Sequence, residues 1–347
     1  PAPQPVALSA ARVPESPGDR PTSDTRLSGF YQNETSYVID DPSHWQKWRH
    51  RLYVSADGAL NDRTTWKLSG WATYDPIFDL TSFYPQEVRS DRQAEAMLRE
   101  TYLDVAAGDW QFRLGRQQII WGEMVGLFVA DVVSAKDLRE FVARDFELIR
   151  IPQWAARAER FAGNLHAELV WIPYVTYDDI GVPEDDFFPG PRPVPGFDTR
   201  IAAGSTPANT LENSSYGFRL SHLSGGWDLA GFYFRSYDLA PVFAAEVSLE
   251  PEPTIVYRPE HRRMHQVGFT AAKDVGRMAV AKAEVVYNRD RWFNVTRVDA
   301  TDGLVQQDFL DYIVGLDTVF ARGTQLNLQF FQRRFLDYDS AIGPVRV

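Results

Sequence analysis

Charged residues that could steer ions or polar solutes are concentrated around residues 121–152. Those in this stretch and just before it are Arg113, Arg116, Glu123, Asp131, Asp137, Arg139, Glu140, Asp145, Glu147 and Arg150. Rings of fixed charge around a water-filled passage select among the ions and solutes that cross it. Apolar residues such as Leu127, Phe128 and Phe141 interleave with these charges, which is unusual for a floppy surface loop. We therefore expect 121–152 to fold into a lumen and constrict it, with a short capped helix over 134–141; an ordinary extracellular loop is the alternative.

A second set of charges lies on single faces of segments that alternate polar and apolar residues. It comprises Lys47, Arg49, Arg51, Arg219, Lys282, Glu284 and Arg333. Against lipid each charge would cost about 2–4 kcal/mol near the midplane, whereas facing water it costs little. We expect these side chains to point inward, either as a field that steers solutes or as ion pairs that brace a polar lumen.

The residues that could support catalysis or bind a cofactor give little signal. None of the six histidines has a metal-ligand spacing, and the absence of cysteine excludes disulfides, thiol chemistry and covalent haem attachment. The acidic run 178–186 offers carboxylates for Ca²⁺ but matches no loop motif, so solvated charge is the simpler interpretation. We expect no enzyme, no cofactor and no metal. The net charge of −11 also argues against nucleic-acid binding.

Short turns and long gaps alternate along the chain and indicate the elements that position these charges. Tight turns are predicted at 56–62, 107–109, 162–164, 224–226, 273–276 and 321–323, and long loops at 75–95, 120–153, 176–213, 239–260 and 290–307. One end of the molecule is therefore compact and the other elaborate. This asymmetry is typical of an antiparallel outer-membrane β-barrel, with short periplasmic turns and long extracellular loops.

The segments between turns and loops have the period of two that barrel strands require. In 66–74, Trp66, Leu68, Ala72 and Tyr74 share one face, and Lys67 lies on the other. Thirteen segments of this kind are predicted: 27–39, 45–56, 63–75, 96–106, 109–120, 154–162, 165–175, 214–223, 227–238, 262–273, 277–289, 309–320 and 324–338. Because bacterial single-chain barrels prefer even strand numbers, we expect about 14–16 strands and an incomplete C-terminus.

Composition agrees with a barrel in the bacterial outer membrane. Aromatic residues make up 14% of the chain, as aromatic girdles would require, and no apolar run reaches the ~18 residues of a spanning helix. A large soluble β-sandwich is the alternative. Residues 1–25 are rich in Pro and Ser and are expected to form a flexible periplasmic tail or plug segment, with 26–347 as the barrel. No signal peptide is visible, and we expect it to have been removed.

Two motifs give the chain a family resemblance. The stretch 113–123 reads RLGRQQIIWGE, and 131–141 reads DVVSAKDLREF, followed by Arg150-Ile151-Pro152. This pattern resembles the domain-of-unknown-function 1302 family of proteobacterial, porin-like outer-membrane proteins, most densely over 110–175. The resemblance implies a barrel and, in association, a periplasmic or inner-membrane export partner and a lipidic or hydrophobic cargo.

The leading expectation for function is a porin-like channel or transporter that passes a solute. The first alternative is a structural barrel that serves as scaffold, sheath or docking ring of an envelope complex, and the second is a barrel hydrolase. Outer-membrane lipid and lipopolysaccharide are the expected surroundings of the barrel.

Overall fold

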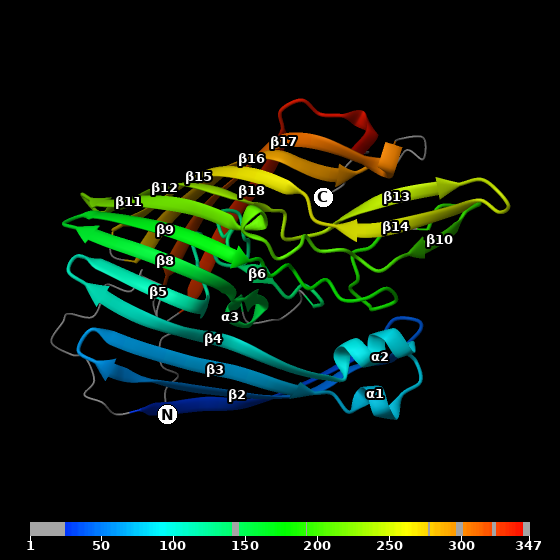
Figure 1. Ribbon diagram of the computed structural model, residues 1–347, viewed down its shortest axis with the longest axis horizontal. Coiled ribbons are helices and arrows are strands. Elements are labelled where there is room, and N and C mark those ends of the chain that lie inside the picture. Colours follow the sequence, from blue (N-terminus) through cyan, green and yellow to red (C-terminus); the bar gives the residue numbers. More distant parts are fainter. Residues whose placement is uncertain are drawn as a thin grey trace.

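One antiparallel sheet of thirteen strands dominates the computed structural model, which describes residues 25–140, 146–191, 193–276, 278–295, 301–320 and 324–342. The sheet curves into a barrel wall (Figure 1). Its strands, in spatial and chain order, are β1 (Arg26–Val38), β2 (His44–Asn61), β3 (Thr64–Tyr74), β4 (Ala94–Ala107), β5 (Trp110–Gln117), β8 (Gln153–Ala162), β9 (Leu165–Tyr174), β11 (Ser215–Ser224), β12 (Trp227–Tyr237), β15 (Arg263–Val275), β16 (Ala279–Asn294), β17 (Leu304–Val319) and β18 (Gln325–Phe335). Within the described residues, β1 and β18 are the two edges of the sheet.

The period of two separates an outer apolar face from an inner face. On β3, Leu68 and Tyr74 are exposed, whereas Ser69 and Trp71 are buried. Successive side chains of a strand point to opposite sides, so the exposed apolar set faces lipid and the other faces the interior. The outer-membrane β-barrel fold is thereby confirmed, and all thirteen predicted segments correspond to strands of this sheet.

The two ends of the wall differ as predicted. Tight turns close one end, on the left of Figure 1, and the longer connections lie at the other. Gly108 and Gly163 have φ of 61° and 59°, a left-handed conformation that glycine adopts without steric cost in such turns. The turn predicted over 56–62 is wrong except at its end, because β2 continues to Asn61, Ala56–Gly58 pair with Leu68–Trp66 of β3, and the turn lies at Asp62 and Arg63.

Several predicted loops contain structure of their own. Residues 75–95 hold α1 (Ile77–Leu80) and α2 (Gln86–Arg92), and a second sheet has the order β10 (Asp198–Ile201), β14 (Thr254–Glu260), β13 (Val242–Ser248). Short 3₁₀ turns span Leu211–Asn213, Thr301–Gly303 and Ser340–Ile342. The helices and the second sheet extend from the loop end of the wall (Figure 1).

The connection between β5 and β8 contains β6 (Ala135–Lys136), α3 (Phe146–Ile149) and β7 (Arg150–Ile151). We predicted a short helix over 134–141, but Ala135 pairs with Ile151 and Lys136 with Arg150 in an antiparallel bridge. That pairing draws the backbone into extended conformation, so the helix prediction is wrong over 134–140, and Phe141 lies outside the described residues. The predicted strand 109–120 ends earlier, at Gln117.

Two further expectations concern parts of the chain beyond the sheet. The N-terminal tail 1–25 lies outside the described residues apart from Thr25. Among the described residues, no helix has the length and apolar character that a bilayer crossing by a helix demands.

Candidate lumenal site

Residues 118–152, the inserted segment, leave the wall and return to it at neighbouring positions. Gln117 at the end of β5 is the direct partner of Gln153 at the start of β8. The whole segment is therefore an excursion from one pair of adjacent strands, and the wall is continuous beneath it.

Apolar side chains hold the first half of the inserted segment against the inner wall. Trp121 is 1% exposed, and its ring centroid lies 5.1 Å from that of Phe232 and 5.7 Å from that of Phe234 on β12. The cluster comprises Ile119, Trp121, Met124, Val129, Ala130, Val132 and Val133 of the segment with Ala155, Val170, Ile172, Phe232, Phe234, Val286 and Ile313 of the wall. Burial of this much apolar surface favours a fixed, packed segment over a mobile loop.

One carboxylate of the wall binds the backbone of the same region. Glu284 on β16 accepts hydrogen bonds from the backbone N–H groups of Glu123, Met124 and Ala130, the last two at 2.8 Å. Buried backbone donors must find partners, and a carboxylate accepts strongly. Glu284 therefore fixes the path of the chain at both ends of the turn 123–130.

Further polar contacts join this part of the segment to the wall. The Trp121 indole donates to Glu168 on β9 at 3.2 Å, and Lys282 donates to the backbone oxygen of Glu123 at 3.0 Å. Arg219 lies 3.8 Å from the Glu123 carboxylate. Burial raises the pKa of Glu123 above its usual range, although Arg219 opposes that effect.

Glu140 lies at the centre of a buried charge cluster near the loop end. It accepts from Lys47 at 2.7 Å and also from Arg49 on β2 and Arg92 on α2. Burial alone would raise the pKa of Glu140, but the three cations outweigh it and lower the pKa to about 2. Arg92 also pairs with Asp185 at 2.6 Å, so the cluster links the segment, the wall and an extracellular loop.

Arg139 forms a second junction beside it. Its guanidinium pairs with Asp137 at 3.0 Å, with Glu95 on β4 at 2.8 Å and with Asp179 at 3.1 Å. Three carboxylates around one arginine form a network in which each ion pair helps to orient the others.

A lumenal cavity of about 150 Å³ remains between the inserted segment and the wall strands β12 and β15–β18. Ion pairs line it: Asp238 binds Arg291 at 2.6 Å, and Asp311 binds Arg333 through two bonds of 2.7 and 2.8 Å. Segment residues reach it from the other side, where Asp131 pairs with Arg150 at 2.6 Å. The cavity is lined by Phe128, Val129, Asp131, Val132, Lys136, Asp178, Ser236, Tyr237, Asp238, Leu239, Ala240, Met264, Gln266, Asn288, Arg291, Asp311 and Arg333.

The predicted charged residues thus separate into several groups. The lumenal cavity is lined by Asp131 and Arg333, and Arg150 is bound to Asp131. The inserted segment is anchored by Glu123, Arg219, Lys282 and Glu284. The two junctions near the loop end are formed by Asp137, Arg139, Glu140, Lys47 and Arg49. Asp145 and the side chain of Glu147 lie outside the described residues.

Two predicted arginines do not join these groups, and a third, Arg51, is connected to the Glu140 junction through Glu34, which lies 3.6 Å from it and 3.1 Å from Lys47. Arg113 binds Asp104 on the neighbouring strand through bonds of 2.7 and 2.8 Å, Arg51 donates to Gln32 at 2.6 Å, and Arg116 donates to the backbone oxygen of Pro152 at 3.3 Å. They brace the wall or the return of the segment.

Sequence reasoning missed several partners of these charges. Arg92, Asp238, Arg291 and Asp311 were not selected as site residues, and the only signal for Asp311 is its place in an alternating strand. The interpretation of 178–186 as solvated charge is wrong for Asp179 and Asp185, which pair with Arg139 and Arg92. Asp178 accepts the backbone N–H of Lys136 at 2.7 Å.

Glu159, His166 and Glu168 have potential metal ligand atoms within 4.8 Å of one another. These side chains already have protein partners: Glu159 pairs with Arg157 at 2.7 Å and with His166 at 3.1 Å, and Glu168 accepts from Trp121. Ordinary pairing on a polar inner wall accounts for this arrangement.

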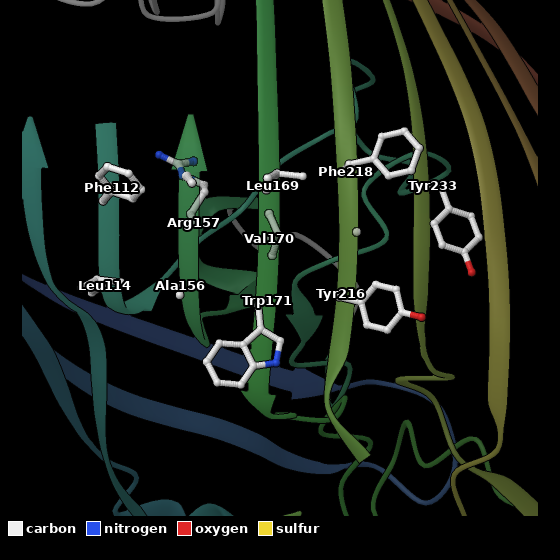
Figure 2. A pocket seen from close by; sticks show the side chains of 12 residues that line it. Phe112, Leu114, Ala156, Arg157, Leu169, Val170, Trp171, Tyr216, Phe218 and Tyr233 are labelled. Carbon is white, nitrogen blue, oxygen red and sulfur yellow. The ribbon is translucent and has the colours of Figure 1, made fainter. Parts of the chain in front are cut away.

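A shallow groove of about 400 Å³ lies across strands β5, β8, β9, β11 and β12. Its side chains Phe112, Leu169, Trp171 and Phe218 are exposed and belong to the outward face of these strands, as Figure 2 shows around the small Ala156. The exposed apolar side chains of this groove face lipid.

Several solved structures are similar to this chain. OmpF of Salmonella typhi in complex with daunomycin is 10% identical, with a TM-score of 0.46 over 90% of this chain and 79% of that chain. The anion-selective porin from Comamonas acidovorans is 10% identical (TM-score 0.44; 91% and 80% covered), and the outer-membrane channel DcaP of Acinetobacter baumannii is 12% identical (TM-score 0.43; 92% and 80%). No curated protein matches the sequence.

The family model described as "Protein of unknown function (DUF1302)" matches residues 43–340, and thus both the wall and the inserted segment. The family prediction made from 113–123 and 131–152 is confirmed: this chain belongs to the DUF1302 family.

Proposed function

We propose that this protein is an outer-membrane channel whose lumen is constricted by the inserted segment. The observation that carries this proposal is the lumenal cavity, a polar space left between a packed segment and the charged wall. Fixed charges at a constriction discriminate among solutes, while a surrounding barrel satisfies its own backbone in the membrane.

The lining favours a small hydrophilic solute. Four carboxylates, Asp131, Asp178, Asp238 and Asp311, face three cations, Lys136, Arg291 and Arg333. Ion pairs between wall residues hold these charges in place, so a solute meets a preformed field. With Arg150, which pairs with Asp131, the acids and bases around the cavity balance, and it is the net charge of −11 that favours cations over anions.

A structural barrel is the second candidate, and the extent of anchoring favours it. The apolar cluster and the buried Glu140 junction fix the inserted segment inside the barrel, as a closed scaffold would also require. The family resemblance also implies a lipidic cargo and an export partner in the periplasm or the inner membrane, and we propose both. An interaction screen with cross-linking in whole cells would test the partner.

Reversal potentials of the purified full chain in planar bilayers test the channel proposal. In a KCl gradient we expect a cation preference that grows when Arg291→Gln removes a cavity cation. Arg160→Gln, at an exposed periplasmic position outside the cavity, is the matched control. A folded protein that never conducts would contradict the proposal and favour the scaffold.

A further inference from the structure

A second cavity, of about 430 Å³, lies at the loop end of the barrel. We name it the outer pocket; it is bounded by residues 178–183, Phe188 and 201–206, with Pro241, Pro259 and His261 at the ends of neighbouring strands. A volume of this size matches small-molecule sites in proteins, which occupy about 300–1,000 Å³.

The outer pocket combines apolar walls with acid groups. Ile180, Val182 and Phe188 contribute apolar surface, and Asp178 and Asp179 contribute carboxylates. Its described lining contains no lysine or arginine. His261 does not supply a cation near neutral pH either, because burial lowers its pKa below the usual value.

Asp178 lines both the outer pocket and the lumenal cavity. One of its oxygens, Oδ1, accepts the backbone N–H of Lys136, which fixes the carboxylate at the boundary. Burial raises the pKa of Asp178 to about 6, although the charges of Lys136 and Arg291, which line the lumenal cavity, oppose that effect. The two cavities therefore meet at an acidic side chain.

We propose that the outer pocket binds small organic cations with an apolar body, and that Asp178 is the point at which they enter the lumenal cavity. Entry rests on the proposed channel function, whereas binding does not. An anion would face two carboxylates, because Arg139, which pairs with Asp179, and Lys136, which lies near Asp178, are both outside the lining of the outer pocket. A neutral molecule would make no use of the Asp178 charge. The free-energy cost of removing a cation from water is offset only where an acidic group pairs with the cation.

Isothermal titration calorimetry on the detergent-solubilised full chain tests the binding step. The probes are 2-phenylethylamine, 2-phenylethanol and phenylacetate, which share a ring and differ in charge. We expect the amine to bind at least about tenfold more tightly than the alcohol, and phenylacetate not to bind. Asp178→Asn should remove the preference for the amine and leave the alcohol unchanged. Glu246→Gln, an exposed carboxylate on the neighbouring β13, should change nothing.

Equal affinities for the three probes, or an unchanged amine preference in Asp178→Asn, would overturn the inference. If Asp178→Asn does not fold, Ala203→Trp provides a second test, since it adds bulk at an exposed lining position. It should abolish amine binding, and retained binding would contradict the pocket assignment. Amine binding without any conductance would refute the channel alone; conductance without probe discrimination would refute the pocket alone.

Discussion

The carboxylate of Glu284 accepts the backbone N–H of Met124 at 2.8 Å and so joins the barrel wall to the inserted segment. The same carboxylate also serves the N–H groups of Glu123 and Ala130. A single wall residue thereby satisfies three donors in a region whose side chains are packed away from water. The narrowing of the lumen depends on contacts of this kind, which several substitutions can test.

Glu284→Ala should release the turn 123–130 from the wall. Each hydrogen bond to a charged group contributes about 1.5–3 kcal/mol, so amide exchange in peptides covering 121–131 should quicken by at least about tenfold. Hydrogen-exchange mass spectrometry of the folded protein measures this. Glu100→Ala removes another wall carboxylate, which pairs with Lys67, and should leave these peptides unchanged. Equal protection in both variants would contradict the role given to Glu284.

Glu140→Gln should loosen the loop-end half of the segment. Removing one partner of a buried charge cluster costs about 3–5 kcal/mol, because Lys47, Arg49 and Arg92 lose their shared acid. Trypsin treatment of intact cells should then cut within 121–152 faster than in the wild type. The control is Glu34→Gln, which lies 3.1 Å from Lys47 but belongs to β1. Unchanged cleavage in Glu140→Gln would show that the cluster does not hold the segment.

Acid should have the same effect as the Glu140 substitution. The pKa of Glu140 is lowered from its ordinary value near 4.5 to about 2 in the folded protein. Its contribution to stability is therefore complete above about pH 4.5 and is lost as pH falls toward 2. Protection of the segment, followed by hydrogen exchange with a correction for intrinsic rates, should decline over that window. Glu140→Gln should show a smaller decline; an identical acid response would assign the effect to other groups.

The strands were predictable from sequence because their signal is local. The alternation of polar and apolar residues in segments such as 66–74 shows which side chains lie on each face of the strand. The short turns determine which strands are neighbours in the sheet. The small sheet of β10, β13 and β14 was missed because its strands lie within stretches that we interpreted as long loops. Ala135 and Lys136 likewise adopted extended structure because of their partners in 150–151, which override local helix preference.

The charged site was only partly predictable, because its ion pairs join residues that are far apart in the sequence. Glu140 meets Lys47 and Arg92, and Arg139 meets Asp179, across gaps that only the curvature of the wall and the path of the segment bring together. The period of two predicts Glu284 on the polar face of its strand, and the side chain is buried there. The period gave no indication that this carboxylate would bind the backbone of residues 123–130.

The central claim is that the inserted segment narrows a conducting lumen, and single-channel conductance in a planar bilayer tests it most directly. Because Gln117 and Gln153 are paired on adjacent strands, residues 118–152 can be replaced by an Asn-Gly turn that closes a hairpin. Heat-modifiable gel migration verifies that both proteins are folded. We predict a small, steady conductance for the wild type and a several-fold larger one for the replacement. Equal conductance in the two folded proteins, or none in either, would contradict the account.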